Sequence, residues 1–99
     1  MEIVKTQKDG KIVFTLNGRL DTTTSPQLQG ALLPAFDESK SVVLDFAGLE
    51  YVSSAGLRVL LLGEKTAKAK DAVMSLINVS KDIKDVFEMT GFTDILKIV

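Results

Sequence analysis

Short apolar runs alternate with helix-forming segments along most of this sequence, and this alternation constrains the fold more than any other feature. Val42–Phe46 and Val73–Val79 are nearly continuous apolar runs, and a stretch of strong helix formers, Ala55–Lys70, separates them. Such runs are typical of strands buried on both faces of a parallel sheet. The pattern therefore predicts a sheet whose strands are joined by crossover helices.

The N-terminal residues show a different pattern. Apolar residues alternate with more polar ones over Lys11–Asn17, which is the period of a half-buried strand. Asp9-Gly10 precedes this segment and suits a two-residue turn, because both positions tolerate positive φ. We therefore expect an antiparallel hairpin in which the run around Ile3-Val4 is the partner strand.

Capping residues mark the expected helix boundaries. Thr24-Ser25-Pro26 combines a hydroxyl cap with proline at the first helical position, and Pro34 is expected to kink or end the helix that follows. Ser80 caps a third helix, which stops at Gly91. A short final strand is expected over Asp94–Val99.

These elements follow one another in the order ββαβαβαβ. A chain of 99 residues holds one hydrophobic core. We therefore expect a single α/β domain over residues 1–99, with one mixed central sheet that begins with the hairpin and continues with alternating helices and strands.

Composition removes several classes of function. The chain has no cysteine and no histidine, so it lacks thiol chemistry, the usual general base and the commonest metal ligand. Its net charge of −1 gives no electrostatic footprint for nucleic acid. No apolar run approaches a membrane span, and Met1–Lys5 does not resemble a signal peptide. We expect a soluble, cytoplasmic protein without membrane insertion.

In open α/β sheets, ligand and partner sites usually lie where strands end and helices begin. Here that edge is expected to carry two loops, Asp21–Thr24 and Gly48–Ser54. The small residues that continue the second loop to Gly56 leave its backbone open to close approach.

Ser53 and Ser54 have two interpretations. One of them simply caps the following helix, which spacing alone favours. Alternatively, one of them is phosphorylated, since a helix N-terminus accommodates the added negative charge through its dipole and free N–H groups. Periodicity does not decide between the two.

An enzyme is disfavoured. No histidine is present to activate Ser54, and both the Gly-x-Ser-x-Gly and the phosphate-loop signatures are absent. A hydrolase that uses Asp21 and Asp45 as paired carboxylates is the remaining option, but acids at strand ends are more often structural. We expect no catalytic residue, no cofactor and no metal.

The second helix is apolar around most of its circumference, with Arg58 the polar exception within Leu57–Leu62. Burial between the sheet and a neighbouring helix is the favoured explanation. The alternative is a docking patch around Leu57, where Gly56 would let a partner backbone approach. Phe92 is a weaker docking candidate, since it more readily staples the end of the last helix.

At these residues the chain resembles the STAS domain of bacterial anti-sigma-factor antagonists. Val43–Leu61 matches the strand–loop–serine–glycine–helix signature of the family in residue types and spacing. Gly18–Asp21 matches the segment after the second strand, and Phe87–Phe92 matches the last helix and its turn. The resemblance covers nearly the whole chain, and the middle string is quite specific.

The resemblance implies a partner-switching module. In that family the unphosphorylated antagonist binds an anti-sigma factor that is also a serine/threonine protein kinase, and so frees the sigma factor. The kinase phosphorylates the antagonist and releases it, and a PP2C-type phosphatase resets the switch. By position, Ser54 is the phosphoacceptor, Asp21 is the acidic residue that contacts the kinase, and Gly56, Leu57 and Arg58 lie at the partner surface.

Two positions depart from the usual pattern of the family. Ser53 replaces the aspartate that often precedes the acceptor, and Ala55 replaces a small hydroxyl residue after it. Ser53 is therefore an alternative acceptor and a further partner contact. Relatives also serve as subunits of lipid-transport ABC complexes, which is the alternative function.

Overall fold

The computed structural model describes all 99 residues and contains one five-stranded sheet. The strands lie in chain order, β1-β2-β3-β4-β5, with β1 antiparallel to β2 and every other pair parallel. This confirms the expected mixed sheet with an N-terminal hairpin. The strands are β1 (Glu2–Lys8), β2 (Lys11–Leu20), β3 (Ser41–Val52), β4 (Val73–Ile77) and β5 (Lys97–Ile98).

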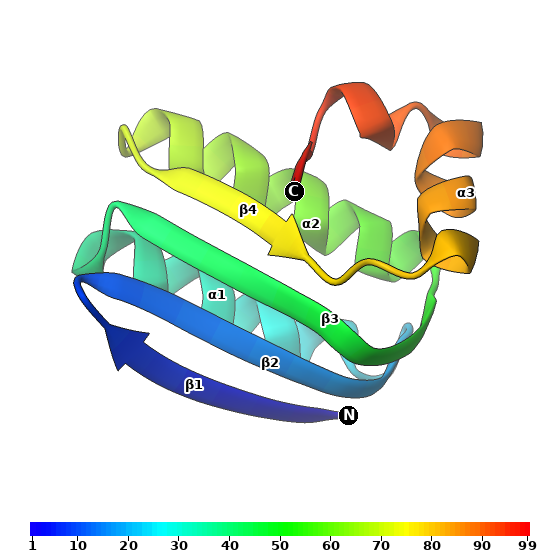
Figure 1. The fold of residues 1–99 in the computed structure, drawn as a ribbon, viewed down its shortest axis with the longest axis horizontal. Helices are drawn as coiled ribbons and strands as arrows, with labels where there is room; N and C mark the ends of the chain where they lie inside the picture. Colours follow the sequence, from blue (N-terminus) through cyan, green and yellow to red (C-terminus); the bar gives the residue numbers. More distant parts are fainter.

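Three helices connect the parallel strands: α1 (Ser25–Glu38), α2 (Ser54–Ala69) and α3 (Lys81–Thr90). In Figure 1, α1 and α2 lie behind the sheet, and α3 stands at the end where β3 and β4 finish. The alternation of helices and strands is confirmed. The last strand is shorter than the expected Asp94–Val99: a 3₁₀ turn, η1 (Phe92–Asp94), ends at Asp94, and β5 contains only Lys97 and Ile98.

Only one face of the sheet is covered by helices (Figure 1). Val42, Leu44 and Phe46 point to that face and are fully buried, whereas Val43 and Asp45 between them are half-buried. The expectation of strands buried on both faces was therefore wrong. Successive side chains of a strand point to opposite faces, so the second set lies on the open side.

The hairpin matches the sequence prediction. Asp9 and Gly10 have φ values of 54° and 79°, and they form the two-residue loop between the paired residues Lys8 and Lys11. Positive φ at both central positions gives a turn whose twist suits the flanking strands.

The first helix differs from the prediction at both ends. Thr24 is its N-cap residue but makes no capping hydrogen bond, because its hydroxyl oxygen accepts from the Asp21 N–H at 2.9 Å while the O–H donates to the Arg19 carbonyl oxygen at 2.7 Å. The expected hydroxyl cap was therefore wrong. The helix also continues through Pro34 to Glu38. Pro34 lies on the exposed side, where water can bind the carbonyl that it leaves without a donor.

The last helix begins and ends as predicted. The Ser80 hydroxyl accepts a hydrogen bond from the Ile83 N–H at 3.3 Å, and Gly91 terminates the helix with a φ of 79°. Phe87 is fully buried between the rings of Phe46 and Phe92, with ring centroids 6.4 and 6.5 Å away. Phe92 therefore packs on the core as a staple.

Candidate functional site

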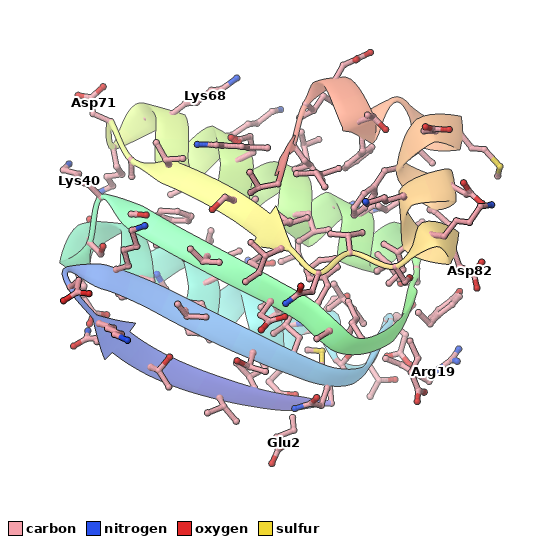
Figure 2. The ribbon with its side chains drawn as sticks, in the orientation of Figure 1. Glu2, Arg19, Lys40, Lys68, Asp71 and Asp82 are labelled. Carbon is pink, nitrogen blue, oxygen red and sulfur yellow. The ribbon has the colours of Figure 1, made fainter.

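The C-terminal ends of β2 and β3 lie side by side and position the candidate site. Leu20 pairs with Val52 in the sheet, and the Ser53 N–H donates to the Leu20 carbonyl oxygen at 2.8 Å. The loop that begins at Asp21 therefore lies next to the first turn of α2. Figure 2 shows Arg19 projecting from this end of the sheet.

Strand β3 extends further than the sequence suggested. Residues 48–52 were expected in a loop, but they pair with β2 as far as Val52, so that expectation was wrong. The pairing with β2 shifts twice along this stretch, and each shift leaves an extra residue in β3. Gly48 gives the Asn17 side chain its space, since a Cβ atom would lie 1.8 Å from Oδ1 of Asn17 and 3.2 Å from the carbonyl oxygen of Leu16. Ser53 consequently follows directly from a hydrogen-bonded strand.

The two serines divide the roles that the sequence left open. Ser53 is the N-cap of α2, and its hydroxyl accepts a hydrogen bond from the Gly56 N–H at 3.2 Å. Ser54 is the first residue of the helix, is exposed, and makes no side-chain hydrogen bond to the rest of the chain. The structural role thus belongs to Ser53, and the free hydroxyl belongs to Ser54.

Behind the serines, the first turn of α2 packs directly on β2. A Cβ atom at Gly56 would lie 2.8 Å from Cγ of Leu20 and 3.0 Å from its carbonyl oxygen. The expectation that Gly56 leaves room for a partner backbone is therefore corrected, because Leu20 of the same chain occupies that space. Leu57 is also buried, with only 8% of its surface exposed.

Most of the apolar surface of α2 is internal, which confirms the burial interpretation. Val59 and Leu60 are buried with Leu57, and Leu61 is half-buried. Leu62 is the exception, with 37% of its surface exposed. Arg58 is exposed one turn after Ser54.

Asp21 organises its own loop. Its Oδ1 atom accepts hydrogen bonds from the backbone N–H groups of Thr23 at 3.0 Å and Thr24 at 3.1 Å. The Thr24 N–H is the main reason that the pKa of this carboxyl is lowered, and the positive charge of Arg19 acts in the same direction. The other carboxylate oxygen accepts no hydrogen bond from the chain, so Asp21 presents an ionised group at the site.

Sequence reasoning missed one pair of residues at this edge. Arg19 and Tyr51 face each other across β2 and β3, and the guanidinium carbon lies 4.2 Å from the centre of the tyrosine ring. Both residues are exposed. Their contact depends on the shifted pairing, so no spacing in the sequence could have revealed it.

Asp21 and Asp45 do not form the paired carboxylates of a hydrolase. Asp45 pairs with Thr15, six residues before Asp21 on β2, which separates the two acids by roughly 20 Å. Its carboxylate instead accepts hydrogen bonds from the Ala47 N–H and the Asn78 amide, both at 3.0 Å. Asp45 therefore fixes the bulged strand, and no group of three acidic side chains is placed to hold a metal.

Four hollows on the surface lie away from Ser54. They are found at the hairpin turn, along α1 (two of them) and beside α3, and none of these four is lined by residues around Ser54. No helix is both long enough and apolar enough to span a bilayer.

Comparisons with known proteins agree with this geometry. The family model described as the STAS domain matches residues 2–99. BtrV of Bordetella bronchiseptica, a candidate anti-sigma factor antagonist, is 32% identical over 99% of this chain and 85% of its own length. The anti-sigma-B factor antagonist of Bacillus subtilis is 26% identical over 93% of this chain and 84% of its own length.

The fold also matches solved structures. SpoIIAA of Bacillus in its phosphorylated form has a TM-score of 0.77 at 19% identity, covering 99% of this chain and 91% of its own. The unphosphorylated form of SpoIIAA, an anti-sigma factor antagonist, has a TM-score of 0.78 at 18% identity, with 99% and 87% covered. These similarities show a shared fold.

Proposed function

The chain belongs to the STAS domain family, and from this premise we propose that it is an anti-sigma factor antagonist that works by partner switching. The unphosphorylated chain binds an anti-sigma factor that is also a serine/threonine protein kinase, and this binding frees the sigma factor. Phosphorylation of Ser54 releases the antagonist, and a PP2C-type phosphatase restores it. The protein acts in the cytoplasm as a kinase substrate and needs no cofactor or metal of its own.

One observation carries this proposal: the two serines at the start of α2 are not equivalent. The Ser53 hydroxyl is engaged with the Gly56 N–H, whereas the Ser54 hydroxyl is exposed and unengaged. A kinase can therefore modify Ser54 without breaking the cap that starts the helix. This favours Ser54 over Ser53 as the acceptor.

The chemistry is a phosphoryl transfer. The Ser54 Oγ attacks the γ-phosphorus of ATP, the bond to the bridging oxygen breaks, and ADP leaves. A basic group of the kinase takes the hydroxyl proton. The product carries about −1.5 to −2 charges at a helix N-terminus, where the dipole and free N–H groups favour it, so the fold is retained.

The partner surface is formed by the residues around this serine. Asp21, Ser53 and Arg58 are the proposed contacts, and the Arg19–Tyr51 pair extends them across the end of the sheet. Gly56 and Leu57 are buried, so we assign them the role of fixing the helix turn that presents the contacts. Phosphate in the middle of this surface blocks the partner by repulsion and by its volume.

The test is a paired capture from lysate of the source organism, read by mass spectrometry. Wild type and Ser54→Asp serve as baits, and Ser80→Asp is the matched control. Ser80 is the exposed N-cap of α3 and is not among the proposed contacts. Aspartate caps helices as well as serine does, so Ser80→Asp adds the same charge at another helix start and keeps α3 intact. We expect wild type and Ser80→Asp to retain a serine kinase of the anti-sigma type and Ser54→Asp to lose it.

Two results would contradict the proposal. Equal retention of the kinase by all three baits would show that Ser54 is not the switch. Retention of transporter ATPase and permease subunits by wild type and Ser54→Asp alike would instead assign the domain to a lipid-transport complex. Incubation of the retained kinase with ATP and Ser54→Ala then checks the acceptor, since this variant should bind and remain unphosphorylated.

A further inference from the structure

The exposed side of α2 carries cations along its whole length. Arg58, Lys65 and Lys68 are exposed on this side together with Ser54 and Leu62, and we call these five residues the α2 strip. They recur at helical spacing, so they share one face of the helix. Figure 2 shows Lys68 projecting from the end of α2 opposite to Ser54.

The three cations of the α2 strip have no partner within the chain. The ion pairs of the molecule join Lys5 to Glu38, Lys70 to Asp37 and Lys81 to Asp85. The one acidic residue of α2, Glu64, lies one turn before Lys68, but it is buried and forms no ion pair. The strip is thus uniformly positive on a chain whose net charge is −1.

We propose that the α2 strip docks on an acidic surface of the kinase partner. This inference rests on the proposed function and adds the chemistry of the partner. Charge complementarity argues for it, because three unpaired cations in line attract a surface of opposite sign and orient the approach. Leu62 supplies an apolar contact in the middle of the strip.

The position of Ser54 in the strip explains why phosphate releases an acidic partner. Arg58 lies one turn from Ser54, so the two side chains are neighbours on the helix surface. Phosphate at Ser54 neutralises Arg58 and turns one end of the strip negative. The same acidic groups that the strip attracts are then repelled.

A protein surface is favoured over an anionic membrane. Helices that lie on bilayers insert a broad apolar face, and the apolar face of α2 is already packed inside the domain. Leu62 alone remains for insertion, and three cations without an apolar anchor bind lipid weakly.

The experiment measures the affinity of the purified kinase, retained by the wild-type bait, for charge-reversal variants. Arg58→Glu, Lys65→Glu and Lys68→Glu change exposed helix positions to a good helix former, so the fold should be retained, and thermal unfolding checks this. Lys8→Glu is the matched control, because Lys8 is exposed beside the hairpin turn at the opposite edge of the sheet. Calorimetric titrations are run in about 0.1 M and about 1 M salt.

We expect each reversal in the strip to weaken binding roughly tenfold at the lower salt concentration, mostly through slower association. The differences should shrink to within about twofold at the higher concentration, where charges are screened within about 3 Å. Lys8→Glu should match wild type at both. Vesicles of phosphatidylglycerol and phosphatidylcholine, sedimented with each variant, give the lipid comparison.

Each outcome decides the inference. Unchanged affinity of the strip variants, for a kinase that Ser54 phosphorylation still releases, overturns the inference and leaves the proposed function standing. If wild type sediments with the vesicles and Lys65→Glu does not, while Lys65→Glu binds the kinase as tightly as wild type, the strip binds lipid instead. If no kinase is retained in the capture, the proposed function fails and the acidic-partner inference fails with it.

Discussion

Replacing Gly56 by alanine should destabilise the protein, although glycine-to-alanine changes within helices usually stabilise. The added methyl group would lie 2.8 Å from Cγ of Leu20 and 3.0 Å from its carbonyl oxygen. Leu20 is fully buried and its carbonyl holds the Ser53 N–H, so neither atom can move freely. The first turn of α2 must shift away from β2 instead.

Two opposing effects set the magnitude. Overpacking a rigid neighbour costs about 1–3 kcal/mol. The higher helix propensity of alanine stabilises by up to about 1 kcal/mol, and this gain is smaller near a helix end. We therefore expect a net loss of about 1 kcal/mol in the free energy of unfolding, or a fall in Tm of roughly 4–8 °C for a domain of this size.

Two other glycines make this a controlled series. At Gly30, on α1, a Cβ atom would meet nothing within 4 Å, so Gly30→Ala should stabilise by up to about 1 kcal/mol. At Gly63 the nearest atoms are 2.7 Å away in Leu32 and 3.0 Å away in Met74, both at side-chain ends that can adjust. Gly63→Ala should fall between the other two variants.

Urea denaturation of the three variants gives the order of their free energies of unfolding. Hydrogen exchange of the Ser53 amide reports whether α2 shifts away from β2. Gly56→Ala should speed that exchange, and Gly30→Ala should not. If Gly56→Ala is as stable as Gly30→Ala and the Ser53 amide remains equally protected, α2 is not packed on Leu20 as described. The positioning of Ser54 would then need another explanation.

Three further predictions concern other parts of the chain. Folding lowers the pKa of Asp21, so this carboxylate contributes its full stabilisation at pH values above the ordinary aspartate pKa, and the stabilisation is lost as the pH falls through the lowered pKa of the folded state. Hydrogen exchange of the Thr24 amide should therefore remain slow at pH values near the ordinary aspartate pKa. Asp21→Ala should accelerate this exchange at every pH. Glu64 is buried and its Oε2 atom lacks a hydrogen-bond partner, so Glu64→Met should raise the free energy of unfolding, measured by urea denaturation, by about 1 kcal/mol. A lower free energy of unfolding in this variant would show that the carboxylate is solvated or paired. Gly91 has a φ of 79°, so Gly91→Ala should lower Tm through a loss of about 1 kcal/mol, whereas an unchanged Tm would mean that the end of α3 relaxes without strain.

Local signals made most of the fold predictable. The Asp9-Gly10 turn, the Ser80 cap and the Gly91 stop each depend on the conformation of a few adjacent residues, so the sequence contains them directly. The serine at the start of α2 was found for the same reason. Which of the two serines caps the helix was settled only by the hydrogen bond to the Gly56 N–H.

The remaining features depend on contacts between distant residues. The extension of β3 beyond Gly48 requires two bulges, and these break the alternating pattern on which strand prediction rests. The Arg19–Tyr51 contact follows from the same shifted pairing.

The open face of the sheet has a similar origin. The parallel strands are added in one direction along the sheet, and crossovers of one hand between such strands place α1 and α2 on the same side. Nothing in the composition of β3 itself indicates which of its faces is left uncovered.

The division of roles between Ser53 and Ser54 has a consequence for how the protein is maintained in the cell. Ser53, and not Ser54, caps α2, so the modification proposed at Ser54 breaks no hydrogen bond of the folded chain. The helix dipole favours the added charge, so under that proposal the modified form unfolds no more readily than the unmodified form. Proteases act on the small unfolded population, so the proposed switch would not shorten the lifetime of the chain. Its state could then be reset without new synthesis of the protein.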